Sequence, residues 1–169
     1  MMKRVGEMAM APESFIRPIF FMLLTLGMLI LVPRARIFEL FRFGLVAGVF
    51  LAAVIQILAV HVLRLWKFNF LVPYLDLFGI PVFLLLAWGV AEILFAHLLP
   101  KKNYFWAFSF VMAFSLASAL VEWFFNKKNL IVFLRWHTTF TFLLAVGIHM
   151  ALGYYLIQKD KLEKTVRMR

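Results

Sequence analysis

The chain contains no cysteine among its 169 residues, and only 15% of its residues are charged. The absence of cysteine excludes a disulfide framework, a thiolate nucleophile and a cysteine-ligated metal site. Motifs of many soluble enzymes are missing too: there is no H-E-x-x-H, no G-x-S-x-G and no phosphate-binding glycine loop. Since a soluble domain has about a quarter of its residues charged, neither a soluble fold nor a conventional soluble active site is expected.

Apolar residues dominate instead. They make up 65% of the chain, with 21 phenylalanines, and the mean hydropathy is +0.95. No soluble fold could bury this much apolar surface, so we expect the solvent to be largely lipid. The net charge of +10 comes from Lys and Arg that cluster between the apolar runs and at the C-terminal end. Residues placed in this way contact lipid headgroups, so the expected partners are membrane lipids and not nucleic acid.

Five apolar runs approach the roughly 20 residues that a helix needs to cross a bilayer. Because backbone groups in hydrocarbon must bond internally, each run predicts an α-helix. The sequence therefore predicts an all-α, polytopic transmembrane bundle over residues 15–157, between a polar segment (1–14) and a basic tail (158–169). Segment 68–81 predicts an interfacial connector with a short helix at the headgroups. The predicted spans are 15–32, 43–63, 81–99, 104–125 and 134–157.

The topology can be predicted from the residues that flank these spans. "VPRARIF" follows the first run where a cleavage site would have small residues, so this run is expected to stay as an anchor. An odd number of spans places the termini on opposite sides. Lys and Arg slightly favour the side of the C terminus, which predicts a bacterial cytoplasmic membrane with a cytoplasmic C terminus.

Small residues recur every fourth position on the second run. Gly44, Gly48 and Ala52 are followed at the same spacing by Gln56. Such a face lets two helix backbones approach closely, and a polar side chain can bond across the contact. The partner is either another helix of this chain, or a second protomer or larger membrane partner. On the fourth run, the face that carries Ser115, Ser118 and Glu122 is expected to point into the bundle.

Glu92 is the clearest ionisable residue inside a span. It lies well within the third run, and such residues are costly in a bilayer and are functional candidates by default. One interpretation is a proton carrier or a ligand-binding carboxyl. The other is a glutamic acid that bonds a neighbouring helix.

A second group of polar residues gathers at one membrane face, because the predicted topology brings several helix ends there. For an enzyme, Glu122, Asp76 and His137 would be the acid–base groups, with Arg135 holding an anionic headgroup and His61 nearby. The alternative is that Arg135 snorkels to headgroups, or that Glu122 and Arg135 form an ion pair that closes the turn. Trp66, Trp123 and Trp136 at similar depth are typical of an interfacial aromatic belt.

Histidines on different helices raise one cofactor hypothesis. A b-type haem could be held by His61 with His137, or by His97 with His149. Neither pair has a confirming motif, and no cluster has the spacing of a zinc site. No cofactor and no metal are therefore predicted, with haem as a minor alternative.

One resemblance is carried by three stretches. "FGIPVFLLLAWGVAEILFAHLLP", a span ending in "ALVEWF" and "LRWHTTFTF" together resemble a family of small, uncharacterised polytopic membrane proteins of Gram-positive bacteria. The resemblance covers roughly residues 15–157 and implies a multi-pass membrane fold, with no assigned activity. More distantly, the chain resembles the carotenoid hydratase and lycopene cyclase-like membrane proteins, which also place acidic residues near helix ends in Trp-rich spans. Their fuller acidic pattern is not evident here.

These observations predict a multi-pass integral membrane protein. Its leading function is non-catalytic: binding of a lipid or another apolar ligand, or service as an accessory subunit. One alternative is an intramembrane enzyme that acts on a lipid or isoprenoid. Another is a small proton-coupled carrier that uses Glu92, although no inverted repeat is visible.

Overall fold

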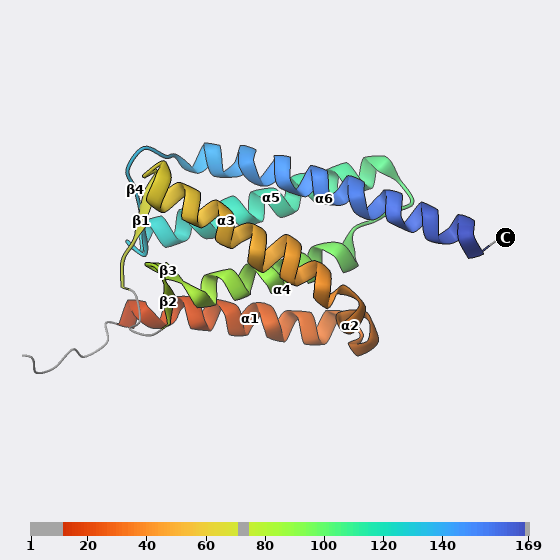
Figure 1. The fold of residues 1–169 in the computed structure, drawn as a ribbon, viewed down its shortest axis with the longest axis horizontal. Coiled ribbons are helices and arrows are strands. Elements are labelled where there is room, and N and C mark those ends of the chain that lie inside the picture. The colour runs from red at the N-terminus through yellow and green to blue at the C-terminus, as the bar shows by residue number, and fades with distance from the viewer. Residues whose placement is uncertain (1–11, 71–74, 168–169) are drawn as a thin grey trace, which may run out of the picture.

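The computed structural model describes residues 12–70 and 75–167. It is mostly helical, and its helices run side by side (Figure 1). Most of the predicted segment 1–14 lies outside the described residues. Four helices are long and apolar enough to cross a membrane: Pro12–Leu31, Arg34–Val62, Tyr104–Lys127 and Thr138–Asp160. The remaining predicted span is the shorter apolar helix Val82–Leu98.

The second helix is longer than the sequence predicted. A turn, η1 (Pro12–Phe15), leads into α1 (Ile16–Leu31), and Pro33 then caps a helix that begins at residue 34 and not at 43. Nothing between these positions breaks a helix, and proline is well tolerated at a helix start. The helix runs through α2 (Arg34–Phe43), η2 (Gly44–Phe50), α3 (Leu51–Ile57) and η3 (Leu58–Val62), of which η2 and η3 are π-helical.

The other three helices are α4 (Val82–Leu98), α5 (Tyr104–Lys127) and α6 (Thr138–Arg167). Asn103 caps α5, since its side chain accepts hydrogen bonds from two backbone N–H groups of the first turn. The predicted tail 158–169 is largely the last part of α6. That segment contains no proline or glycine, so the helix can continue into it.

The short helix predicted within the connector 68–81 is not found in its described residues, 68–70 and 75–81, which form strands and turns, and residues 71–74 lie outside the described part of the chain. β1 (Trp66–Phe68) pairs antiparallel with β4 (Ile131–Phe133), and β2 (Asp76–Leu77) pairs with β3 (Ile80–Pro81). β1 buries its two aromatic residues and exposes Lys67 between them, a strand pattern. The β2–β3 turn needs a left-handed backbone, with φ of 75° at Gly79.

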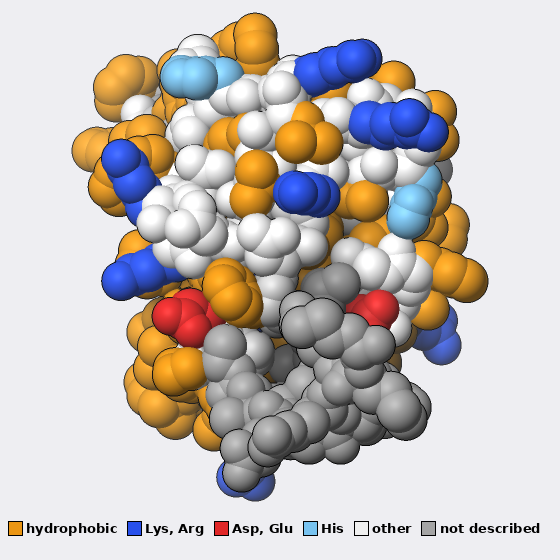
Figure 2. All heavy atoms as spheres, turned by 90° about the vertical axis from the view of Figure 1, so that its left-hand side faces the viewer, with side chains coloured by type: hydrophobic (Ala, Val, Ile, Leu, Met, Phe, Trp, Pro, Cys, Tyr) orange, Lys and Arg blue, Asp and Glu red, His pale blue; other side chains and the backbone are white. Residues whose placement is uncertain are grey.

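The strands close one end of the bundle, which is seen face on in Figure 2. Lys and Arg side chains are scattered over this face, and hydrophobic side chains gather at its margins. Exposed basic residues there include Arg64, Lys67, Lys128 and Arg135. A charged cap above apolar helix sides is typical of a protein end at the headgroup level.

α4 is the most buried helix, and it packs against α1 and the long second helix. Ala87, Phe95 and Ala96 are 0% exposed. Its 17 residues span about 25 Å, slightly less than the roughly 30 Å of a bilayer core. α4 therefore serves as a central support for the neighbouring helices.

The small-residue face of the second helix contacts α4 of the same chain. A Cβ atom added to Gly48 would lie 2.5 Å from the Cα of Gly89 and 2.7 Å from the carbonyl oxygen of Trp88. One added to Gly44 would lie 2.8 Å from the carbonyl oxygen of Gly89. Of the two partners that the sequence left open, the structure gives a helix of the same chain for this face.

Arg17 ties α1 to the strand end of the bundle. Its side chain is only 2% exposed, and its guanidinium donates to the carbonyl oxygens of Phe70, Asn69 and Leu130 at 3.2, 3.0 and 2.6 Å. Backbone carbonyls of loops that lie far apart in the sequence are thereby satisfied by one planar group.

We predict that Gly48→Ala lowers the free energy of unfolding by about 1–3 kcal/mol, because the new methyl group would overlap the α4 backbone. Gly27→Ala is the matched control, since nothing lies within 4 Å of its added Cβ, and it should cause no loss. Unfolding in mixed detergent and SDS micelles, followed by circular dichroism, measures both. Equal behaviour of the two variants would contradict the close helix contact.

Arg17→Lys should lower the free energy of unfolding by about 2–3 kcal/mol, because one ammonium group cannot reproduce the fork of donors to three carbonyls. Arg42→Lys, at an exposed position of α2, is the control and should be neutral. The same SDS titration checks the pair. An unchanged Arg17→Lys protein would show that the carbonyl contacts contribute no net stability.

Candidate functional site

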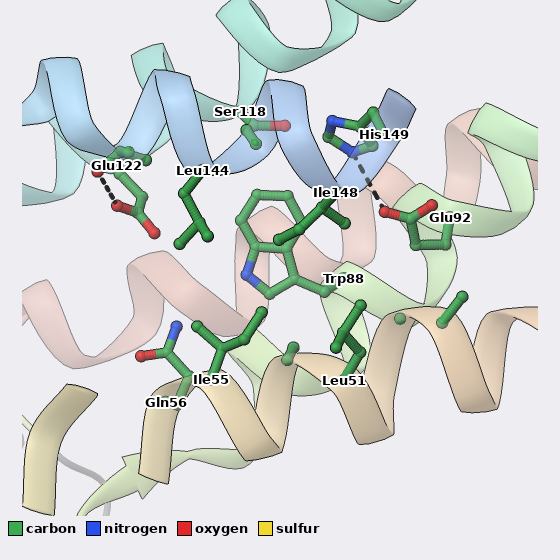
Figure 3. A pocket seen from close by; sticks show the side chains of 15 residues that line it. Leu51, Ile55, Gln56, Trp88, Glu92, Ser118, Glu122, Leu144, Ile148 and His149 are labelled. Atoms are coloured by element: carbon green, nitrogen blue, oxygen red, sulfur yellow. Dashed lines mark hydrogen bonds and ion pairs between the residues drawn. The ribbon is translucent and has the colours of Figure 1, made fainter. Parts of the chain in front are cut away.

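A cavity of about 90 Å³ lies among four helices, near the middle of the bundle and toward its strand end. The long second helix forms one wall, α6 the opposite wall, and α4 and α5 the remaining sides (Figure 3). A volume of this size exceeds the space that one buried water needs. The polar residues that line it are Gln56, Trp88, Glu92, Ser118, Glu122, Thr141 and His149.

Glu122 enters the cavity from α5, near its strand end. Its Oε2 atom accepts a hydrogen bond from Thr141 Oγ1 at 2.9 Å, and Thr141 Oγ1 accepts one from Trp136 Nε1 at 2.8 Å. The predicted Glu122–Arg135 ion pair is wrong. Thr141 lies within the first turn of α6, which packs against α5, whereas the Arg135 side chain is exposed in the segment before that helix.

Glu92 and His149 form a buried pair at the other end of the cavity, with exposures of only 4% and 3%. His149 Nε2 lies 3.2 Å from Glu92 Oε1, and His149 Nδ1 lies 2.9 Å from the Ser115 hydroxyl. Glu92 Oε2 is buried and has no partner among the described residues. This geometry agrees with the interpretation in which Glu92 bonds a neighbouring helix.

The haem pair His97 with His149 does not fit this geometry. Both ring nitrogens of His149 are engaged by Glu92 and Ser115, and the rings of Phe95 and Phe114 lie 5.0 Å from its ring centroid. No ring nitrogen is left to face an iron atom. Within residues 12–70 and 75–160, no group of three or more His, Asp or Glu residues could hold a metal ion.

Gln56 and Trp88 complete the polar lining. Gln56 is 4% exposed, and its Oε1 atom accepts a hydrogen bond from Trp66 Nε1 at 2.9 Å. The small-residue face of the second helix thus continues through Gly48 and Ala52 into the cavity wall. The polar end of that face bonds β1, not a helix as the spacing had indicated.

The other predicted site residues lie at the strand end but do not line the cavity. His61 Nε2 is 2.9 Å from the carbonyl oxygen of Phe78, and Asp76 Oδ2 accepts from the backbone N–H of Gly79 at 3.1 Å. His137 caps the start of α6, where its Nδ1 accepts from the backbone N–H of Thr139 at 3.3 Å. The acid–base trio Glu122, Asp76 and His137 is therefore not assembled in one pocket.

Sequence analysis did not assign Trp88 or Thr141 to the site, and it considered His149 only as a haem ligand paired with His97. His149 lies well inside the long fifth run. The distance of each residue from the ends of its apolar run would have indicated the pair. Glu92 and His149 both lie in the interior of their runs, so the two side chains are at a similar depth and can meet when the helices pack. Trp88 and Thr141 carry no such signal, since both residue types are common in membrane helices.

We predict that Glu92→Leu lowers the free energy of unfolding by about 3 kcal/mol, because it leaves a buried imidazole with an unpaired ring nitrogen. The double variant Glu92→Leu/His149→Leu should cost less than the sum of the single variants, with a coupling energy of about 1–3 kcal/mol. SDS titration of the wild type, the two single variants and the double variant completes this double-mutant cycle. The exposed substitution Glu39→Leu is the control. Strict additivity would contradict an energetic contact between the two side chains.

Comparison with known proteins adds no relative to this description. No family model, no curated protein and no solved structure matches the chain. The predicted resemblance to a Gram-positive membrane protein family stays a prediction. The interpretation of the site therefore rests on its geometry.

Proposed function

We propose that this multi-pass membrane protein binds an amphiphilic ligand, taken from the lipid phase, in the cavity between its second helix and α6. The observation that carries the proposal is a cavity of mixed polar and apolar lining whose rim is apolar. Leu144 at the rim is 38% exposed, and Leu51, Ile55 and Ile148 beside it are half-buried. A ligand that reaches this cavity from the side comes from hydrocarbon and not from water.

The groove beside the cavity supports this route. Leu51, Leu144 and Ile148 line both the cavity and an apolar hollow that continues along α6. A ligand with a polar end in the cavity would thus have an apolar surface for the rest of its length. The remaining residues of the hollow are Leu143, Gly147, Ala151 and Leu152.

The contacts favour binding over catalysis. An enzyme that transfers protons needs its acid and base within reach of one ligand atom, and of the predicted trio only Glu122 faces the cavity. Glu92 and His149 could move a proton between themselves. However, no continuous polar path through the bundle is formed by the hydrogen bonds among residues 12–70 and 75–160, which counts against the carrier alternative.

The setting of this function is also a proposal. A bacterial cytoplasmic membrane with a cytoplasmic C terminus agrees with the basic residues near the helix ends. Membrane lipids are the proposed partners. A homo-oligomer or a larger partner would need a surface other than the one at Gly44 and Gly48, which α4 occupies.

The test is native mass spectrometry of the full-length protein extracted from its own membrane in mild detergent. We expect a bound small amphiphile of one defined mass. Ala52→Phe, which fills the cavity from the α3 wall, should lose at least nine-tenths of it, whereas Ala117→Phe on the exposed face of α5 should retain it. Equal retention by both variants, or a wild-type protein that never carries a ligand, would contradict the proposal.

A further inference from the structure

We infer that the polar group of the ligand is an uncharged hydroxyl, held between Glu122, Gln56 and Trp88, with its apolar chain in the groove along α6. The class of ligand is thus a neutral long-chain or isoprenoid-type alcohol. This inference rests on the proposed function, because it names the ligand of the same cavity. It is carried by hydrogen-bonding groups that three different helices bring to one end of the cavity and that no described residue satisfies.

The three groups are one acceptor, the Glu122 carboxyl oxygen, and two donors, the Gln56 amide and the Trp88 ring nitrogen. Thr141 occupies only Oε2 of Glu122, and the other carboxyl oxygen points into the cavity (Figure 3). Of the two polar atoms of the Gln56 amide only the oxygen can accept from Trp66 N–H, so this contact fixes the amide orientation and leaves the amide N–H groups for the cavity.

Trp88 supplies the second donor. Its ring nitrogen points toward the space between Glu122 and Gln56 in Figure 3. Among the described residues, neither this ring nitrogen nor the amide nitrogen of Gln56 has a hydrogen-bond partner. Both donors open onto the cavity, and polar groups inside a helix bundle are normally paired, so two donors without a protein partner there indicate a group that fills the cavity.

A hydroxyl matches this set. Its O–H can donate a hydrogen bond to Glu122, and its oxygen can accept two, one from an amide N–H of Gln56 and one from the ring N–H of Trp88. An ammonium group has donors only and would leave both N–H groups unpaired. A phosphate or carboxylate has acceptors only, would face the Glu122 carboxyl, and would find no Lys or Arg in the cavity lining.

The size of the cavity and the direction of the groove agree with a long-chain alcohol. About 90 Å³ holds a hydroxyl and its first carbons, so a longer chain must leave the cavity. The groove offers the path, because it shares three residues with the cavity and continues to Leu152. From Thr141 to Leu152 the helix rises about 16 Å, which lies within the hydrocarbon region and suits an alkyl or isoprenoid chain.

The test compares four probes with the same alkyl chain: dodecan-1-ol, dodecyl methyl ether, dodecylamine and dodecyl phosphate. Each is added at equal mole fraction to nanodiscs of phosphatidylcholine that contain the full-length protein, and bound probe is counted by native mass spectrometry. We expect the alcohol to bind about tenfold more tightly than the ether, which cannot donate to Glu122, and more tightly than either charged probe.

Variants then test which residues cause the preference for alcohol over ether. Glu122→Met keeps the side-chain length but removes the acceptor, so the alcohol and the ether should bind equally. Trp88→Phe removes one donor and should weaken alcohol binding about fivefold. Trp106→Phe, which is 60% exposed on α5, and Glu39→Gln are the matched controls and should leave the preference unchanged. Should Glu122→Met fail to fold, the inference is tested by whether Trp88→Phe weakens alcohol binding.

The outcomes separate the inference from the proposed function. If Ala52→Phe abolishes binding but the wild type takes ether, amine or phosphate as well as alcohol, the hydroxyl inference is overturned and the lipid-phase cavity stands. A preference for alcohol that survives Glu122→Met and Trp88→Phe overturns it too. If no probe binds and the cavity holds water only, both proposals fail together.

Discussion

The close approach of two helix backbones at Gly48 and Gly89 sets the geometry on which the rest of the protein depends. A single methyl group at Gly48 would lie 2.5 Å from the α4 backbone, so no larger residue fits there. The contact seats the second helix on α4, the most buried helix. It also decides which residues of the two helices face each other further along, and these include Gln56 and Trp88 in the cavity wall.

Polar groups inside this bundle are paired by short local arrangements, each of which joins two segments. Arg17 joins α1 to the loops at the strand end, Thr141 joins α6 to α5, and the Glu92–His149 pair joins α4 to α6. In a medium without water, such pairing is the alternative to an unsatisfied group that costs several kcal/mol. Among the described residues, Arg17 Nε and Glu92 Oε2 are the enclosed side-chain atoms without a partner, whereas the unpaired N–H groups of Gln56 and Trp88 open onto the cavity, where a ligand can reach them.

The helices were predictable and their partners were not. Apolar runs predict helices because length and hydropathy are local properties, and each of the five runs contains a helix, four of them long and apolar enough to cross a membrane. Ends were less accurate: residues 34–42 look like a basic loop in sequence, yet after Pro33 nothing there stops a helix. The strand pair β1–β4 joins segments about 65 residues apart, and such pairing leaves little trace in three-residue strands.

The candidate site was predicted in part, for a similar reason. Glu92, Glu122 and Gln56 were identified because polar residues are rare in apolar runs, and all three line the cavity. Asp76 and His137 were grouped with Glu122 by topology, which gives depth along the membrane but not angular position around the bundle. Trp88 and Thr141 needed that angular information, which comes only from how the helices pack.

The three acceptors of Arg17 have a consequence for biosynthesis. Two of them, the carbonyls of Asn69 and Phe70, are made more than 50 residues after Arg17, and the third, that of Leu130, is made 113 residues after it. In the proposed membrane protein, α1 would therefore enter the bilayer during translation with an arginine whose final partners do not yet exist. Until the segment after α5 has emerged, that guanidinium must be solvated at the membrane surface. The first helix can therefore reach its final position only after the chain as far as Leu130 has been made.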